Sequence, residues 1–253
     1  MSRPLLTTED LSLSFGGVHA VSGVSLAVRE KSLHVVIGPN GAGKTTFFHL
    51  LSGVYKPTRG IIRFGGEDIT ALGPAQRVKL GIARSYQRTN IFPRLTVREN
   101  LSLAAARAAG EGWSVVPRSS SHTASALVDE ALTLLNLKHF AEREAQTLPY
   151  GVQRLIDIGI ALCCRPKLLL LDEPTSGLST AELREAVDIL KTLREHFTIL
   201  LIEHNMELVV GLADRISVLN FGSLLAEGTA EEIGSNQEVQ QAYFGTRAKA
   251  ALQ

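Results

Sequence analysis

The chain has 253 residues, of which 45% are hydrophobic and 20% are charged, and its 26 basic and 25 acidic residues give a formal net charge of +1. This length and composition predict one large globular domain, or a domain with a subdomain, around a sizeable core. The near-neutral charge argues against a nucleic-acid-binding surface or an electrostatically bound membrane surface.

The cysteines and the N-terminal segment bear on location. Cys163 and Cys164 are the only cysteines, and they lack the spaced partners of a zinc site or a disulfide framework, which favours a reducing compartment. The start, MSRPLLTTED, lacks the apolar core of a signal peptide, and no run approaches the ~20 apolar residues that cross a bilayer. We therefore expect a cytoplasmic protein that reaches a membrane only through partners.

The first part of the chain predicts strands and one helix. LSLSF and VSLAV alternate apolar and other residues, and LHVVIG is a short apolar run that ends in glycine. GKTTFFHLLSG is typical of a helix closed by glycine. We expect strands at residues 11–15, 24–28, 33–38 and 60–66, and a helix at residues 43–53.

From about residue 88 the apolar spacing becomes helical. Three helices are expected, at residues 96–109, 124–137 and 153–164. Between the first two, the polar residues 110–122 carry glycine, proline and serine, which predicts a flexible insertion.

Strand patterns return towards the C-terminus. KLLLLD and TILLIE flank a helical pattern at residues 180–196, and this strand–helix–strand order is typical of a parallel sheet covered on both faces. RISVLN and SLLAEG predict a hairpin, and TAEE at residues 229–232 predicts a capping box that opens a short helix.

The order of these elements predicts the domain organisation. An α/β core of about residues 1–87 and 165–253 is interrupted by a mostly helical subdomain of about residues 88–164. No internal repeat or low-complexity tract is present. We expect a single domain over residues 1–253, in which the helical subdomain is an insertion into the α/β core.

One glycine-rich loop carries a specific chemical signal. GPNGAGKT, residues 38–45, matches G-x-x-x-x-G-K-[ST] in full, so backbone N–H groups and a helix N-terminus can surround phosphate oxygens. Lys44 can reach the outer phosphates and Thr45 can ligate Mg²⁺. A chance glycine-rich turn is the alternative, but the preceding strand and following helix favour a phosphate site. The residues expected to hold the nucleotide are Gly38, Pro39, Asn40, Gly41, Ala42, Gly43, Lys44, Thr45 and Thr46.

A P-loop needs a carboxylate at the end of a nearby strand, and LLLLDE supplies two. Asp172 ends the apolar run and would organise Mg²⁺. Glu173 points to the opposite side of the strand, so it could polarise an attacking water. Buried strands often end in surface acids, but the P-loop elsewhere in the chain favours a functional role.

Three further residues are weaker candidates. His204 follows the run LLIE, at the strand end where open α/β sheets place ligands. Gln87 stands where the sheet gives way to helices and could touch Mg²⁺ or water, although an ordinary loop residue is the alternative. Phe15 could stack on a base, or be a core phenylalanine.

The P-loop, Gln87, LPYGVQR, LLLLDEPTSGL and His204, in this order and spacing, resemble the ATP-binding subunit of ABC transporters over essentially the whole chain. FGGVHAVSGVSLAV and GIARSYQRTNIFPRLTVRENL resemble in particular the subunits that energise branched-chain amino acid uptake. The resemblance implies an α/β fold with a P-loop NTPase core, a parallel sheet, an antiparallel β subdomain and an inserted helical subdomain.

The resemblance also implies cofactors, roles and partners. The cofactors would be ATP and Mg²⁺, with Phe15 stacking on adenine, Gln87 touching Mg²⁺ and water, and His204 contacting the γ-phosphate. A second ATP-binding subunit, the same chain or a homologue, would bind head to tail. Integral-membrane permeases, and indirectly a solute-binding protein, would complete the assembly, without nucleic acid. The chain itself would be cytoplasmic and bound peripherally to the inner face of the cell membrane.

In such a dimer each subunit's signature loop, LSGGQ in the family, acts on the ATP held by the partner's P-loop. Here residues 148–152 read LPYGV, so the serine hydroxyl and the glutamine amide are missing. Tyr150 and Gly151 would still contact the partner's ATP, more weakly than a full signature. Ser179 stands where the family's D-loop often has Asp or Asn, which weakens the expected cross-subunit contact.

Alternatives remain open at this point. The same ATPase role could serve another cargo, such as urea, amides or lipopolysaccharide. The altered signature also allows a nucleotide-gated regulatory module that hydrolyses ATP weakly, although the presence of Glu173 and His204 argues against it. If the partner is a different chain with a full signature, this chain's own site is expected to be the competent one.

Overall fold

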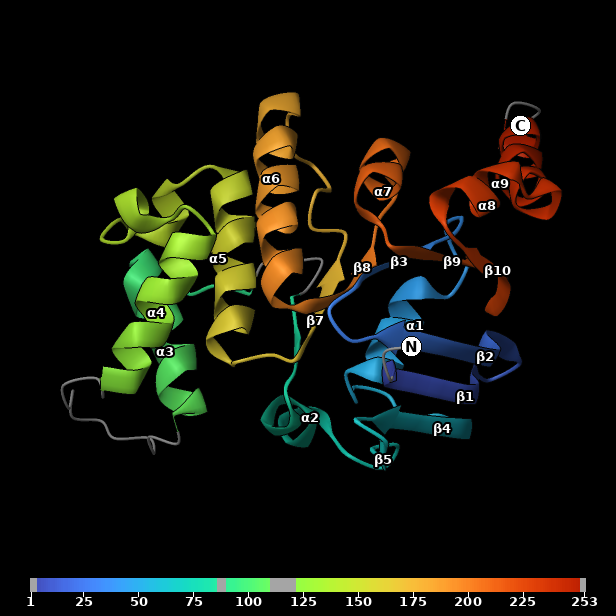
Figure 1. Ribbon diagram of the computed structural model, residues 1–253, viewed down its shortest axis with the longest axis horizontal. Coiled ribbons are helices and arrows are strands. Elements are labelled where there is room, and N and C mark those ends of the chain that lie inside the picture. The colour runs from blue at the N-terminus through green and yellow to red at the C-terminus, as the bar shows by residue number, and fades with distance from the viewer. Residues whose placement is uncertain (1–3, 86–89, 110–121, 251–253) are drawn as a thin grey trace. The chain divides into compact units, whose positions relative to one another are not determined.

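The computed structural model describes residues 4–85, 90–109 and 122–250. The chain divides into two compact units, residues 1–77 with 198–253, and residues 78–197 (Figure 1). Each unit is described separately below. No helix in the described part of the chain is long and apolar enough to cross a membrane.

The first unit contains an antiparallel sheet in the order β2-β1-β4-β5. A long hairpin forms its centre, with Phe15 opposite Val18 across a turn of two glycines. Its strands are longer than the expected segments 11–15 and 24–28, because flanking polar residues also join the ladder. The strands are β1 (Pro4–Phe15), β2 (Val18–Arg29), β4 (Arg59–Phe64) and β5 (Glu67–Asp68). The antiparallel β part of the predicted fold is therefore confirmed.

The same unit contains the parallel strands that carry the P-loop. β3 (Leu33–Ile37) pairs in parallel with β8 (Thr198–Ile202) on one side and β9 (Arg215–Asn220) on the other. All residues of β3 and β8 are buried, which explains their continuous apolar sequences. β10 (Ser223–Gly228) returns antiparallel to β9 and confirms the predicted hairpin.

The helices of this unit follow the expected end signals. α1 (Lys44–Leu51) follows β3, and Thr229 caps α8 (Ala230–Ser235) through the predicted capping box with Glu232. The sequence did not predict the short helices α2 (Pro74–Leu80), which runs into the second unit, and α7 (Met206–Leu212), or the C-terminal helix α9 (Gln237–Ala250). Figure 1 shows α8 and α9 beside the β9–β10 hairpin, with which both make contacts.

Arg77, which is buried, supports the end of α1. Its guanidinium donates to the carbonyl oxygens of Leu50 at 2.6 Å, Leu51 at 2.8 Å and Ile69 at 2.9 Å. Carbonyl groups in the last turn of a helix have no N–H donors within the helix, so the Arg77 guanidinium supplies the donors that are missing. Burial lowers the pKa of Arg77 to about 10, which leaves it charged at neutral pH.

The second unit contains β6 (Ile82–Arg84), which pairs in parallel with β7 (Leu168–Asp172), and a set of helices. α3, α4 and α5 confirm the three predicted helices, although α4 and α5 begin two or three residues earlier than expected. Of the predicted insertion 110–122, residues 110–121 lie outside the described residues. The helices are α3 (Val97–Ala108), α4 (His122–Leu134), α5 (Tyr150–Cys163) and α6 (Thr180–His196), with short 3₁₀ helices at Lys138–Phe140 and Ala145–Thr147.

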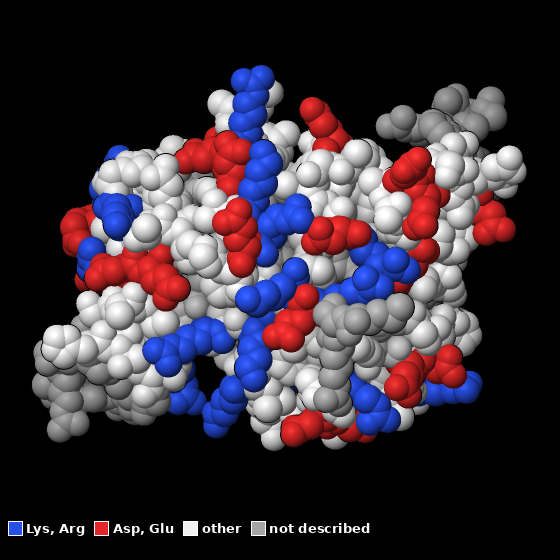
Figure 2. Space-filling view, viewed as in Figure 1, with Lys and Arg blue, Asp and Glu red and all other residues white. Residues whose placement is uncertain are grey.

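Charged side chains of both signs are interspersed over the face drawn in Figure 2, as the net charge of +1 leads one to expect. The predicted limits of the helical subdomain, residues 88 and 164, stay a prediction.

One buried histidine predicts a pH dependence of stability. The His34 imidazole nitrogen lies 2.8 Å from the Ser217 hydroxyl. Burial lowers the pKa of His34 from 6.5 to about 4; Glu227 raises it and Arg215 lowers it by smaller amounts. The unfolded chain therefore binds a proton near pH 6.5 that the folded chain does not bind until about pH 4. The free energy of unfolding is expected to fall by up to about 3 kcal/mol as the pH drops through this window.

Urea unfolding of the wild type and of His34→Gln between pH 4 and 7.5 measures this effect. The difference between the two stability curves should shrink or reverse as the pH falls, because glutamine cannot take up the proton. Parallel curves would contradict the assignment to His34.

Candidate functional site

In the first unit the P-loop joins the end of β3 to the start of α1. Lys44 is the first residue of α1, and its ammonium donates to the carbonyl oxygens of Gly38 at 2.7 Å and Pro39 at 3.0 Å. Only 6% of Lys44 is exposed. The lysine thus holds the start of the loop closed around itself, and the loop is preformed.

Gly43 shows why the loop needs glycine. It caps α1 with φ 93°, a left-handed conformation, and a side-chain carbon there would lie 2.3 Å from the carbonyl oxygen of Ala20. α1 has no side-chain cap at its N-cap position and no acidic residue in its first turn. The positive end of the helix dipole is therefore not offset locally, which suits an anion.

The turn between β9 and β10 supports the loop from behind. The Gly222 N–H donates to the carbonyl of Ala42 at 3.0 Å, and the Ser22 N–H donates to the carbonyl of Gly222 at 2.8 Å. Ala42 is buried by this contact, whereas Asn40 and Gly41 at the loop tip are exposed. Thr45 and Thr46, in the first turn of α1, are half-buried.

Phe15 lies at the end of β1 with 47% of its surface exposed. Its ring packs edge to face on Tyr55, with 5.3 Å between ring centres, and Tyr55 packs in the same way on His49 of α1 at 5.0 Å. The core alternative for Phe15 is therefore wrong, because a core ring would be covered. No sequence pattern pointed to Tyr55, since only the fold brings it against Phe15 at the end of β1.

If Phe15 stacks on the base, Phe15→Ala should weaken ATP binding by about 0.5–1.5 kcal/mol, or about two- to tenfold, because the stacking area is lost. Titration of the full chain with ATP by calorimetry measures the change. Phe92→Ala is the matched control, since 54% of that ring is exposed in the second unit. Equal weakening by both substitutions would contradict the role.

His204 lies two residues beyond the end of β8 and is exposed. Its backbone N–H donates to the carboxylate of Glu203 at 3.1 Å, and Glu203 is 3% exposed. Asn205 caps α7 by accepting from the Leu208 N–H at 3.1 Å. Because β3 and β8 are adjacent and parallel, their carboxyl ends place the P-loop and His204 at one edge of the sheet.

In the second unit Asp172 ends β7, as predicted, and pairs with an arginine. The Arg84 guanidinium lies 2.8 Å from the Asp172 carboxylate, and the two side chains are 4% and 1% exposed. The sequence reading missed Arg84. The signal that could have found it is the sequence GIAR, in which Arg84 directly follows apolar residues. An arginine at the end of a buried strand needs an acidic partner for its charge.

Glu173 is half-buried, in a left-handed backbone conformation with φ 48°. Arg154 of α5 donates to the carbonyl oxygens of Asp172 at 3.2 Å and Glu173 at 2.5 Å. Left-handed conformations are unfavourable for residues other than glycine, so such contacts help to hold this one. Arg154 was also missed; its signal is a charged residue within the buried, mostly apolar face of α5, which also contains Asp157.

The signature loop leads directly into α5, which begins at Tyr150 and not near Val152 as expected. Proline is acceptable just before a helix, so Pro149 takes the N-cap position, where it makes no side-chain cap. Tyr150 is 45% exposed, and Gly151 is buried. Ser179 caps α6 in a capping box with Glu182, and it ends residues 176–179, SGLS, the segment that the resemblance assigns to the D-loop. Gln87 lies outside the described residues.

Two family models match the chain. The ABC transporter model matches residues 21–176, and the branched-chain amino acid ATP-binding cassette transporter model matches residues 223–249. The second match covers β10, α8 and most of α9, a C-terminal segment outside the motifs that carried the family resemblance.

Named relatives and solved structures agree with these matches. The high-affinity branched-chain amino acid transport ATP-binding protein BraF of Pseudomonas aeruginosa is 43% identical, with 97% of this chain and 99% of that protein aligned. LivG of Escherichia coli K12, described in the same words, is 41% identical over the same shares. An ATP-binding cassette of an ABC transporter has a TM-score of 0.85 at 27% identity, covering 96% of this chain and 99% of its own. The chain therefore belongs to the ABC transporter family, as one of its ATP-binding, ATP-hydrolysing subunits.

Proposed function

We propose that this chain hydrolyses ATP to drive uptake of branched-chain amino acids, or of a similar small polar solute, through membrane permeases. The observation that carries the chemistry is the preformed P-loop at the start of α1, closed by Lys44. The cargo is supported by the similarity to BraF and LivG along the full chain and by the family match at residues 223–249.

Each candidate residue takes a part in the proposed reaction. Phe15 stacks on adenine, residues 38–46 hold the phosphates, and Lys44 neutralises their outer charge. Glu173 accepts a proton from the water that attacks the γ-phosphate, and His204 contacts that phosphate. Positioning and charge stabilisation supply most of the rate enhancement in phosphoryl transfer, so a rigid frame matters more than a strong nucleophile.

The donor groups fit a magnesium ion. Among the described residues no cluster of three or more His, Cys, Asp or Glu side chains could hold a metal by itself. Mg²⁺ prefers a few oxygen ligands from protein, with phosphates and waters completing its coordination, and the Thr45 hydroxyl, the Asp172 carboxylate and the Gln87 amide are such ligands. When bound, the ion would supply charge neutralisation on the phosphates.

The buried Arg84 has a role in this scheme. The Asp172 carboxylate is 1% exposed, and the Arg84 guanidinium at 2.8 Å compensates its buried charge. Arg84 therefore holds the Asp172 carboxylate in a fixed orientation at the end of β7. Arg154 fixes the next peptide, which aims the Glu173 side chain.

The assembly is proposed by family similarity. Two ATP-binding subunits, this chain with itself or with a homologue, pair head to tail against permease subunits on the inner face of the cell membrane, and a solute-binding protein delivers the cargo. The helical subdomain at about residues 88–164 would contact the permeases, and Gln87 would connect it with the nucleotide. ATP binding then shifts the equilibrium towards the closed pair.

A nucleotide-gated module with weak hydrolysis is the second candidate, because the signature loop lacks two polar side chains. Steady-state ATP turnover of the chain, reconstituted with its membrane subunits, decides between the two. Turnover that rises when the transported solute and its binding protein are added supports the transport ATPase. Nucleotide binding without measurable turnover supports the module.

A further inference from the structure

A carboxylate of the chain itself lies at the start of α5. A side-chain carbon added at Gly151 would meet Oε1 of Glu182 at 2.6 Å and its Cδ at 3.1 Å, so only glycine leaves room for this group. Glu182 Oε1 therefore lies against the backbone of Gly151, in the first turn of α5. Pro149 provides no side-chain cap, and the carboxylate of another helix is the anionic group that lies at the first turn of α5.

The same carboxylate also caps its own helix. Its Oε2 accepts from the Ser179 N–H at 2.9 Å and from the Ser179 hydroxyl at 2.6 Å. One negative charge therefore lies at the N-termini of both α5 and α6, where it interacts favourably with the positive ends of the two helix dipoles. The pKa of Glu182 is lowered by the Ser179 hydroxyl first, then by the Ser179 and Gly151 N–H groups, so the group is ionised at neutral pH.

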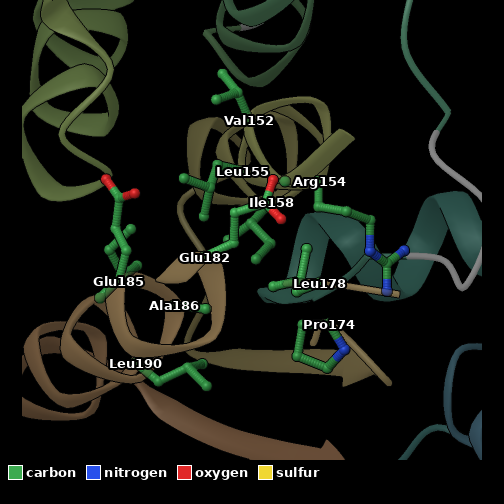
Figure 3. A pocket seen from close by; sticks show the side chains of 12 residues that line it. Val152, Arg154, Leu155, Ile158, Pro174, Leu178, Glu182, Glu185, Ala186 and Leu190 are labelled. Carbon is green, nitrogen blue, oxygen red and sulfur yellow. The ribbon is translucent and has the colours of Figure 1, made fainter. Parts of the chain in front are cut away.

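The surroundings fix this arrangement. Figure 3 shows the Glu182 side chain pointing from α6 towards α5, beside Leu155, Ile158 and Leu178, which line the same pocket. The start of α5 also meets the D-loop, since Tyr150 Cε1 is 3.4 Å from the position that a side-chain carbon of Gly177 would take. The signature loop and the D-loop of this chain are therefore joined at two points.

We propose that Glu182 is a positioning residue that occupies the anion-binding end of α5 and competes there with the γ-phosphate of ATP bound to the partner subunit. The inference rests on the proposed function, in which the signature loop acts on the partner's ATP. Two anions cannot both lie against Gly151 at the start of α5 without strong repulsion, so phosphate binding displaces the carboxylate. Its release loosens the cap at Ser179, which transmits nucleotide binding in one site to the D-loop.

Glu182→Gln tests the competition. Glutamine also forms the capping box with Ser179, so α6 keeps its cap while the negative charge is lost. In the full chain carrying Glu173→Gln to block hydrolysis, association is followed by sedimentation as Mg·ATP is raised. Glu182→Gln should lower the half-saturating ATP concentration about three- to tenfold, because the competing anion is gone. Glu185→Gln, three residues along the same helix and exposed, is the matched control and should change it less than twofold.

If Glu182 only stabilised the signature loop, Glu182→Gln would raise the half-saturating ATP concentration, because a less ordered loop would bind the partner's ATP more weakly. A raised or unchanged half-saturation in Glu182→Gln would therefore overturn the inference. Failure of the parent chain to associate at any ATP concentration would count against a self-paired proposed function, and the competition would fall with it.

Hydrogen exchange of the nucleotide-free full chain tests the contact independently of ATP. In Glu182→Gln the amides in the first turn of α5 should exchange about three- to tenfold faster than in Glu185→Gln. Equal rates would show that Glu182 does not hold Gly151 and would overturn the inference, even if association responds to ATP.

Discussion

Glu173→Gln should lower ATP turnover about 100- to 1,000-fold while leaving nucleotide binding within about twofold of the wild type, because a positioned general base contributes about 10²–10⁴-fold to such reactions. Glutamine keeps the size of the side chain but cannot accept the proton. The backbone should stay in place, since Arg154 holds the Glu173 carbonyl, which the substitution leaves unchanged. Turnover of the reconstituted transporter and ATP titration of the isolated chain measure the two quantities.

Glu185→Gln is the control for this substitution, because Glu185 is an exposed carboxylate nearby in sequence that the proposed reaction does not use. The ATP turnover of Glu185→Gln should remain within about twofold of the wild-type value. A small loss of turnover in Glu173→Gln would mean that another group serves as the base. If the partner is a different chain, a larger loss from changing the partner's equivalent acid would also contradict the expectation that this chain's site is the competent one.

Arg84→Met should lower the free energy of unfolding by about 3–5 kcal/mol, because removing one partner of a buried ion pair leaves the other charge uncompensated. Asp172 is 1% exposed and its carboxylate lies 2.8 Å from Arg84. Denaturant unfolding, read in the absence of nucleotide and magnesium, measures the loss without any contribution from ligand binding.

Two further variants make this prediction specific. Arg98→Met removes an arginine that is 40% exposed and pairs with Asp129 and Glu142, so its cost should stay below about 1 kcal/mol. The double variant Arg84→Met with Asp172→Asn should recover a large part of the loss, because no buried charge then remains uncompensated. A cost for Arg84→Met as small as that for Arg98→Met would contradict the account of the buried pair.

The sequence by itself determined the elements whose signals are local. Mostly apolar runs identified β3, β7 and β8, because a strand that is buried on both faces carries few polar residues on either face. Glycine spacing identified the P-loop, and Thr229 with Glu232 identified the cap of α8. The strand ends located Asp172, Glu173 and His204. The short helices α2 and α7 escaped prediction, since seven residues hold too few turns for a clear period.

Only the tertiary structure decided which distant side chains meet. Arg84 and Asp172 are 88 residues apart in sequence, and the buried pair forms because β6 and β7 are neighbours in the sheet. Glu182 is recognisable in the sequence as a capping residue of α6, but its second contact, with Gly151, depends on how α6 packs against α5. Hydrophobic periodicity is a property of one element at a time, whereas the partner of a buried charge is set by the packing of two. The sequence therefore determined the family and the phosphate chemistry, and the packing of α5, α6 and β7 determined how the signature loop is held.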